Sequence, residues 1–252
     1  MELLLDCGNS RVKWAAQVRG RFVAGSAVAA GGRGFQPALD GAWGGLAGVR
    51  RVLAASVAAP AVEELLREVV ADRFGLEVEF LASPVAALGV RNGYADPARL
   101  GIDRFLGLVA ARARIDDALV LASAGTAFTL DALAADGRHL GGLIIPGAAL
   151  MRRSLARGTA KLREAPGEFV EFPDTTADAV WSGTLQALAG AANRFVRLAA
   201  RRFGARPRLV LTGGAAPALS PLLADAERMD DLVLDGLALW ARPRRTRRPG
   251  AL

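Results

Sequence analysis

Apolar residues in the first part of the chain alternate between strand-like and helix-like spacing. Short apolar runs at residues 3–5 and in VKWAAQV, GRFVAGSAV and RRVLAASVAAP have the length and the flanking turn residues of β-strands. The segment AVEELLREVVADRFG has apolar residues at helical spacing and ends in glycine, which predicts an amphipathic helix. VEFLAS then predicts another strand, so strands and helices alternate here.

The opening pattern returns later in the chain. RLGIDRFLGLVAARAR has one apolar helical face and carries Asp103 in its first turn. DALVLASAGTAFTLDALAADGRHLGGLIIPG then repeats the earlier order of apolar run, glycine turn, alternating strand, Asp136-Gly137 turn and further strand. This internal repeat predicts two lobes, residues 1–115 and 116–252, with a boundary near residue 115.

The remaining segments complete the second lobe. AALMRRSLARGTAKL and DAVWSGTLQALAGAANRFVRLAARRFG predict helices, RLVLTGGAAPAL a buried strand followed by a Gly-Gly turn and a helix, and DLVLDGLALWAR a final strand and helix. The pattern as a whole predicts an α/β fold in which each lobe has a mixed sheet led by β-hairpins and covered by helices.

Composition and charge fit a globular protein without a membrane span. Of the 252 residues, 52% are hydrophobic and 23% charged, enough apolar content for a sizeable core. Most of the net charge of +7 comes from the basic tail at 241–252, which we interpret as a solubilising terminus. Binding of this tail to nucleic acid or anionic lipid is the alternative. The apolar stretches are too short to cross a membrane.

The single cysteine and single histidine offer little chemistry by sequence. Cys7 cannot form an intrachain disulfide, and the N-terminus lacks the residue order of a signal peptide, so we expect a cytoplasmic protein. Neither Cys7 nor His139 has a sequence context that suggests a nucleophile–base pair or a zinc site, and we interpret both as non-catalytic.

Three glycine turns carry the first functional signal. DCGNS and SAGTA each lie between the first two strands of a lobe, and LTGGAA joins a strand to a helix. A single glycine turn is ordinarily just permissive backbone. Backbone N–H groups exposed in such turns also bind anions, and two of them on facing lobes with a Gly-Gly turn predict a nucleotide cleft between the lobes.

These motifs resemble those of the type III pantothenate kinases, within the superfamily of acetate and sugar kinases, heat-shock chaperones and actin. The likeness covers nearly the whole chain and rests on DCGNSRVKW, ASVAAP, NGYADPARLGIDR, SAGTAFTLD, GRHLGGLIIPG, GTAKL and TTADAVWSG, in the family's order. It implies two actin-like, ribonuclease H-like lobes. It also implies ATP-dependent phosphorylation of pantothenate to 4'-phosphopantothenate, the first step of coenzyme A biosynthesis.

The resemblance also implies an acceptor side. Asp103 would accept or orient the proton of the substrate hydroxyl, and Arg104 would pair with the pantothenate carboxylate. Thr176 would reach the substrate from the partner subunit of a homodimer. By residue type alone, Asp103 is an ordinary first-turn acid, Arg104 a solvated arginine and Thr175 or Thr176 a helix N-cap. The substrate-binding residues implied are Asn92, Tyr94, Gly101, Ile102, Arg104 and Thr176.

A nucleotide side is implied as well. Asp6 would hold Mg²⁺ through water, because this hard ion retains much of its hydration. Lys13 would face the phosphates, with an exposed strand lysine as the alternative. Gly213 and Gly214 would lie against the base or ribose. The phosphate-facing residues implied in the two hairpin turns are Gly8, Asn9, Ser10, Arg11, Lys13, Gly125, Thr126 and Ala127.

One position departs from the family. Ser123 opens the second glycine turn, where the family commonly has an acid associated with a monovalent cation. A hydroxyl is a poorer cation ligand than a carboxylate, which puts activation by K⁺ or NH₄⁺ in doubt. Asp131 could serve nearby or be purely structural. Three rival functions stay open: a kinase of another small acceptor, a non-catalytic regulatory or nucleic-acid-binding accessory protein, and a nucleotide-binding paralogue without catalysis.

Overall fold

The computed structural model describes residues 1–159, 161–162 and 165–242, which fold into two compact units. The first unit consists of Met1–Ala82 and the C-terminal residues from Val233 onward, and the second of Ser83–Leu232. The predicted tail at 241–252 lies outside the described residues from position 243 on.

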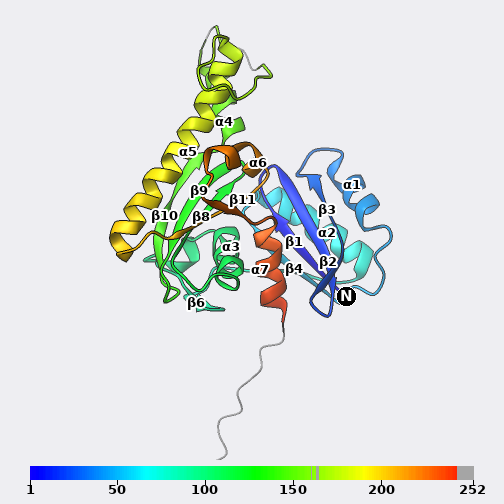
Figure 1. Cartoon of the computed structure of the whole chain (residues 1–252). Helices are drawn as coiled ribbons and strands as arrows, with labels where there is room; N and C mark the ends of the chain where they lie inside the picture. The colour runs from blue at the N-terminus through cyan, green and yellow to red at the C-terminus, as the bar shows by residue number, and fades with distance from the viewer. Residues whose placement is uncertain (160, 163–164, 243–252) are drawn as a thin grey trace, which may run out of the picture. The chain divides into compact units, whose positions relative to one another are not determined.

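The first unit is built on a mixed five-stranded sheet (Figure 1). Its strands lie in the order β3-β2-β1-β4-β5, with β1, β2 and β3 antiparallel and β4 and β5 parallel to β1. The strands are β1 (Glu2–Cys7), β2 (Arg11–Val18), β3 (Arg21–Ala29), β4 (Arg51–Ser56) and β5 (Val78–Phe80). The helices of this unit are α1 (Phe35–Trp43), α2 (Pro60–Phe74) and α7 (Leu232–Ala241).

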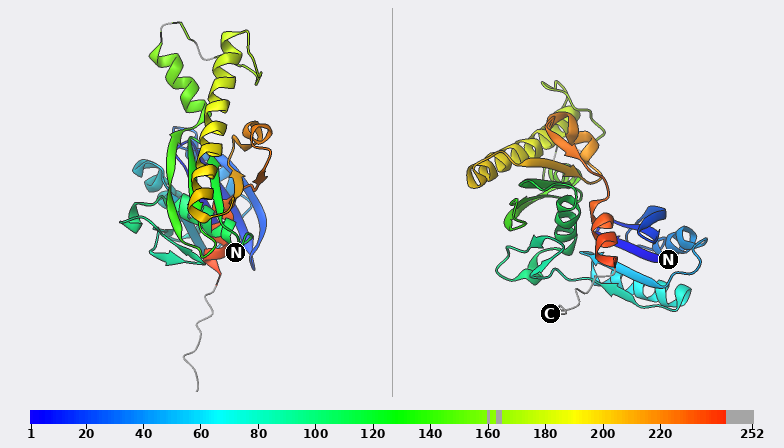
Figure 2. Two further views of the ribbon diagram at one scale, coloured as in Figure 1. Left: turned by 60° about the vertical axis from the view of Figure 1, so that its left-hand side comes forward. Right: turned by 60° about the horizontal axis from the view of Figure 1, so that its bottom comes forward.

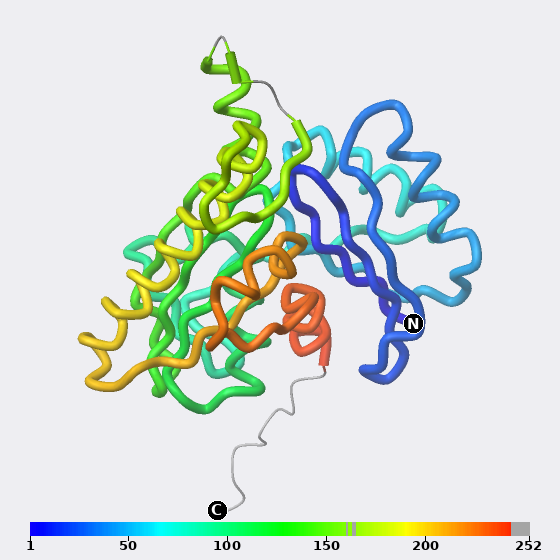
Figure 3. Tube along the Cα trace, turned by 45° about the horizontal axis from the view of Figure 1, so that its top comes forward, coloured from blue at the N-terminus to red at the C-terminus, as the bar shows by residue number. Residues whose placement is uncertain are grey.

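Alternation along β1 decides which side of this sheet is covered by α1 and α2. Leu3, Leu5 and Cys7 pack in one hydrophobic cluster with residues of both helices, so α1 and α2 lie on the same face (Figure 3). The helix α2 ends at Gly75, whose left-handed backbone caps it as the sequence predicts.

The second unit repeats this arrangement. Its sheet has the order β10-β9-β8-β11-β12, again an antiparallel three-stranded meander followed by two parallel strands. The strands are β8 (Leu119–Ala124), β9 (Ala127–Leu133), β10 (His139–Pro146), β11 (Arg208–Thr212) and β12 (Ala226–Arg228). The matching strand order in the two units confirms the internal repeat inferred from the sequence.

Short elements and longer helices surround the second sheet. The helices are α3 (Ile102–Arg112), α4 (Ala148–Gly158), α5 (Thr176–Phe203) and α6 (Ala216–Leu219), with the 3₁₀ turns η1 (Pro97–Arg99) and η2 (Ser220–Leu222) and the small hairpin β6 (Ala86–Ala87) and β7 (Val90–Arg91). Val120, Ala122 and Phe128 pack on α5, whereas Leu121 faces Gly107 of α3. The two helices therefore cover opposite faces of the sheet (Figure 2).

The structure differs from the sequence-based expectations in several places. Residues 83–115, expected in the first lobe, belong to the second compact unit, because α3 packs on β8 and β9. The C-terminal residues from Val233 onward, expected in the second lobe, belong to the first unit. The strand predicted at the start of DLVLDGLALWAR is wrong, since α7 begins at Leu232. A short apolar run fits either element by periodicity alone. The helix α4 ends at Gly158, short of the predicted Leu162.

Candidate active site

In the first unit, the turn after β1 is tied to the end of β4. The Gly8 N–H donates to the carbonyl oxygen of Arg11 at 3.0 Å, which closes the turn. Asn9 Nδ2 donates to the carbonyl oxygen of Val57 at 3.1 Å, and the Val57 N–H donates to that of Cys7 at 3.0 Å. The DCGNS and ASVAAP motifs thus form one local structure that holds the turn in place.

Asp6 and Lys13 are register partners on β1 and β2. Residues directly opposite on antiparallel strands project from the same sheet face, so a carboxylate and an ammonium lie close together beside the turn. Both side chains are partly exposed, whereas Ser10 and Arg11 at the turn are exposed. The turn therefore combines a fixed backbone with charged groups of both signs.

Cys7 points the opposite way, into the hydrophobic core, and is fully buried. Burial, reinforced by the charge of neighbouring Asp6, raises the pKa of the Cys7 thiol well above its ordinary value. The thiol therefore stays protonated and packs as a small apolar group.

In the second unit, the equivalent turn lies against the Gly-Gly turn after β11. The Gly125 N–H donates to the Ala127 carbonyl at 3.0 Å, and the Ala215 N–H donates to the Ala124 carbonyl at 3.0 Å. Gly213 has φ +98°, and a Cβ there would lie 2.5 Å from the carbonyl oxygen of Ala124. Only glycine fits this close approach. The structure thus brings together the predicted nucleotide-side residues Gly125, Thr126, Ala127, Gly213 and Gly214.

Ser123 belongs to a row of hydroxyl side chains across three strands. Its register partners are Thr129 on β9 and Thr212 on β11, so the three side chains project from one face of the sheet. Asp131, two residues beyond Thr129, projects from the same face. Three hydroxyl side chains therefore lie side by side at the start of the second glycine turn.

Asp103 lies in the first turn of α3, directly after Gly101 and the buried side chain of Ile102. Its Oδ1 accepts the backbone N–H of Arg104 at 2.8 Å. Burial raises the pKa of the Asp103 carboxyl above its ordinary value, although the N–H of Arg104 opposes this shift. The side chain keeps part of its surface exposed.

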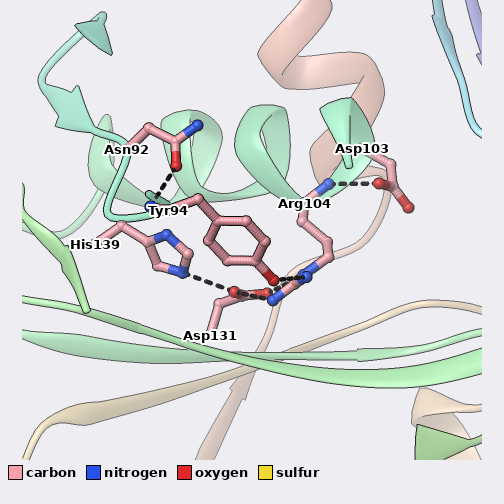
Figure 4. A network of polar contacts seen from close by, with 6 residues as sticks. All are labelled: Asn92, Tyr94, Asp103, Arg104, Asp131 and His139. Carbon is pink, nitrogen blue, oxygen red and sulfur yellow. Dashed lines mark hydrogen bonds and ion pairs between the residues drawn. The ribbon is translucent and has the colours of Figure 1, made fainter. Parts of the chain in front are cut away.

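Arg104 points away from solvent into a network of polar contacts (Figure 4). Only 6% of its surface is exposed. Its Nε and Nη2 donate to the two carboxylate oxygens of Asp131 at 2.9 and 2.6 Å, and its Nη1 donates to Tyr94 Oη at 2.7 Å. Desolvation lowers the pKa of the guanidinium, but Asp131 and Tyr94 outweigh it and raise the pKa overall. Arg104 is therefore not a solvated helix arginine.

Asn92 organises the loop that carries Tyr94. Its Oδ1 accepts the Tyr94 N–H at 3.0 Å, and its Nδ2 donates to the carbonyl oxygens of Pro84 and Pro97 at 3.2 and 2.9 Å. The intervening Gly93 lies so close to β10 that any Cβ would overlap the His139 carbonyl oxygen. The NGY motif therefore fixes the position of the tyrosine ring.

Thr175 and Thr176 have different roles at the start of α5. Thr175 is the N-cap, since its Oγ1 accepts the Asp178 N–H at 3.2 Å. Thr176 is the first helical residue and its side chain is exposed. Helix capping therefore explains the threonine at position 175 and not the one at position 176.

His139, whose sequence context predicts no catalytic role, lies in the polar network of Arg104, Asp131 and Tyr94. His139 is 1% exposed, and its Nε2 lies 2.8 Å from Asp131 Oδ1. The sequence allows either a cation-binding or a structural role for Asp131, and in the structure its carboxylate contacts Arg104 and His139. In the sequence, the contact between His139 and Asp131 is indicated only by the fact that GRHLGGLIIPG and SAGTAFTLD belong to adjacent predicted strands.

In the described part of the chain, protein side chains alone do not form a metal site. Across the described residues, no group of three or more His, Cys, Asp and Glu residues could hold a metal ion. Asp6 is a single carboxylate, which suits Mg²⁺, because this ion takes most of its ligands from water and substrate phosphates. Within the same described part of the chain, no helix is long and apolar enough to span a membrane.

The two repeated sheets, with a glycine turn after the first strand of each, define an actin-like α/β protein, the class that contains sugar kinases and related ATPases. A solved structure of a ROK family glucokinase from Streptomyces griseus, with glucose and AMPPNP, has a TM-score of 0.51 and 14% identity over 95% of this chain and 98% of that one. Component A of the (R)-2-hydroxyglutaryl-CoA dehydratase of Acidaminococcus fermentans has a TM-score of 0.53 and 15% identity over 95% and 96%. These likenesses show the fold alone.

The sequence comparisons are more specific. The family model for type III pantothenate kinase matches residues 2–198. The type III pantothenate kinase of Nitrosococcus oceani is 42% identical over 96% of this chain and 94% of its own length, and that of Thiobacillus denitrificans is 44% identical over 95% and 96%. The chain belongs to the type III pantothenate kinase family. It is accordingly an enzyme, and a kinase that uses ATP and a divalent metal.

Proposed function

We propose that the chain transfers the γ-phosphoryl group of ATP to the primary hydroxyl of pantothenate, the first step of coenzyme A biosynthesis, with Asp103 as the base. Family membership supports the reaction. The observation that supports the base is the partly exposed carboxylate in the first turn of α3, with its raised pKa. A base of this kind is matched to a hydroxyl proton better than a fully solvated aspartate.

On the acceptor side, the chain's own residues orient the hydroxyl and bind the substrate. Asp103 accepts the proton as the oxygen attacks phosphorus, and the cationic Arg104 beside it binds the pantothenate carboxylate. Tyr94 and Asn92 would border the bound pantothenate, Gly101 would let it approach the backbone at the start of α3, and Ile102 would contact it. The fixed loop from Asn92 to Tyr94 supports this arrangement.

On the nucleotide side, the glycine turns hold the phosphates. Backbone N–H groups of the turns after β1 and β8, with Asn9, Ser10, Arg11 and Lys13, neutralise the triphosphate. Asp6 would hold Mg²⁺ through water, and the bound ion would supply positive charge beside the phosphates. Gly213 and Gly214 contact the base or ribose. In Asp6→Asn, the Mg²⁺ concentration that gives half-maximal turnover should rise, because a ligand-holding carboxylate is lost.

The three hydroxyl side chains of Ser123, Thr129 and Thr212 affect how strongly a monovalent cation could bind at the second glycine turn. Three hydroxyls in place of a carboxylate hold K⁺ or NH₄⁺ weakly, so we propose that the kinase is largely independent of these ions. Turnover measured from zero to 100 mM KCl at constant ionic strength tests this, with NaCl as the compensating salt. A steep K⁺ activation would contradict it.

We propose further that the kinase is a cytoplasmic homodimer in which Thr176 of each subunit completes the other's acceptor pocket. The outer strand β10 exposes Leu143 and Ile144, at 43% and 67%, and Leu150 of α4 is also exposed, which supports an interface there. Mixed dimers of Asp103→Asn and Thr176→Ala subunits test it. Random mixing leaves one intact site per heterodimer, so about a quarter of wild-type turnover should return. If the mixture has only the average of the residual activities of the two variants, Thr176 does not act across the dimer interface.

A coupled assay of ADP release tests the reaction itself. We expect turnover with pantothenate and none with acetate or sugars. Turnover with another acceptor alone would favour a different small-molecule kinase. Absence of turnover with any acceptor, with nucleotide binding retained, would favour a non-catalytic paralogue. A regulatory protein that binds nucleic acid through the tail would show salt-sensitive DNA affinity that is lost on deletion of residues 242–252.

A further inference from the structure

Arg104 is held in place by a buried carboxylate that has no part in the chemistry proposed above. The two oxygens of Asp131 accept from Nε and Nη2 of Arg104, and Asp131 is 1% exposed. A side-on, two-point contact fixes both the position and the plane of a guanidinium. Asp131 therefore sets the direction in which the rest of the Arg104 side chain points.

A buried histidine holds the carboxylate in turn. His139 Nε2 lies 2.8 Å from Asp131 Oδ1, the same oxygen that accepts from Arg104 Nη2. Because a carboxylate paired with arginine has no proton to give, Nε2 is the donor, and this assigns the tautomer. The imidazole also stacks on the ring of Tyr94, with centroids 5.9 Å apart and an angle of 15° between the planes. His139 thus contacts two members of the network (Figure 4).

The contacts leave Arg104 with donors to spare. A guanidinium has five N–H groups. Two are used by Asp131 and one by the phenol oxygen of Tyr94. One N–H on each of Nη1 and Nη2 is left over, and the fixed plane of the guanidinium determines where these two point. A substrate carboxylate would meet donors that are already oriented.

The backbone of β10 leaves room for this ion pair. Gly142 is the register partner of Asp131. A Cβ there would overlap the carbonyl oxygen of Leu130 and would also lie 2.6 Å from Asp131 Oδ1 and 2.8 Å from Arg104 Nη2. Any side chain at this position would displace the pair. Gly142, the second glycine of the pair in GRHLGGLIIPG, therefore leaves the space that the Arg104–Asp131 ion pair occupies.

We infer that Asp131 and His139 are positioning residues for the acceptor, acting through Arg104 and Tyr94. This inference rests on the proposed function, in which Arg104 binds the acceptor beside Asp103. If Asp131 and His139 only joined α3 to the sheet, their replacement would lower stability and leave the Michaelis constants of the folded enzyme unchanged. If Asp131 and His139 position Arg104, their replacement must weaken binding of pantothenate and not of ATP.

The test compares steady-state kinetics of Asp131→Asn, His139→Gln and His139→Leu in the full chain. Loss of a hydrogen bond to a charged group should raise KM for pantothenate roughly 10- to 100-fold in Asp131→Asn, with KM for ATP within about twofold of wild type. His139→Gln, whose amide nitrogen can still donate to Asp131, should keep KM for pantothenate well below that of His139→Leu. Asp136→Asn, which breaks the exposed Arg91–Asp136 pair nearby, is the matched control.

Two results would overturn the inference. One is an unchanged KM for pantothenate in Asp131→Asn, or an equal rise in both Michaelis constants. The other, which decides if Asp131→Asn does not fold, is identical kinetics for His139→Gln and His139→Leu. Wild-type turnover of pantothenate is measured first. If it is absent, the proposed function fails and the inference falls with it, whereas an active wild type with unaffected variants refutes the inference alone.

Discussion

Replacement of Asp103 by asparagine tests the proposed base with little disturbance of the fold. The amide has nearly the same shape, and its Oδ1 can still accept the Arg104 N–H that the carboxylate accepts at 2.8 Å. Only the charge and the proton acceptor are lost. A positioned general base contributes roughly 10²- to 10⁴-fold to the rate. We therefore expect kcat to fall by this factor, equivalent to about 3–5 kcal/mol of transition-state stabilisation.

The assay is ADP release at saturating ATP with pantothenate varied, for wild type, Asp103→Asn and Glu63→Gln. Glu63 is also a first-turn carboxylate, on α2 of the first unit, so its variant controls for a general effect on helix termini. For wild type, kcat/KM should fall on acidification, because the base must be ionised. The midpoint should lie above the ordinary range, since burial raises the pKa of Asp103. A kcat for Asp103→Asn within about threefold of wild type would refute the reasoning.

Three further outcomes are expected. Because folding raises the pKa of Asp103, the wild type loses stability as pH rises through this raised pKa, and the loss is absent below the ordinary pKa of the group. The melting temperature of Asp103→Asn relative to wild type should therefore rise from acid to neutral pH, and a constant difference would contradict this. Gly213→Ala should lower the free energy of urea unfolding by about 1–3 kcal/mol and raise KM for ATP, because φ is +98° and the Cβ would meet Ala124. The control variant Gly214→Ala should unfold like wild type, because its new Cβ meets no atom within 4 Å. Cys7→Ala should retain turnover and lose about 1 kcal/mol of stability, and inactivation of a folded variant would show that the thiol takes part in the reaction.

The strands and their repeat could be predicted because their signal is local. Alternating apolar residues and glycine turns define β1, β2 and β3, and again β8, β9 and β10, and the matching order predicts equivalent sheets. The helix α1 was missed because Pro37 and Gly41 within it are typical of loops, although Phe35, Leu39 and Trp43 recur every four residues and are buried.

The residues of the proposed site could be located by motif, but their contacts could not. Spacing places Asp103 in a first helical turn and Gly8 and Gly125 in hairpin turns, and the structure has them there. Arg104 and Asp131 are 27 positions apart, so no periodicity links them. They meet only because α3 packs on the face of β9 from which Asp131 projects.

Most of the strands, the repeat and the family follow from the amino-acid sequence alone, because short-range periodicity and motif order are properties of the chain. Tertiary structure alone decided that Arg104 is buried and that Asp131 and His139 accompany it. A buried guanidinium requires a partner with matching charge and geometry. Which carboxylate supplies that partner depends on strand register and on the packing of a helix from elsewhere in the chain.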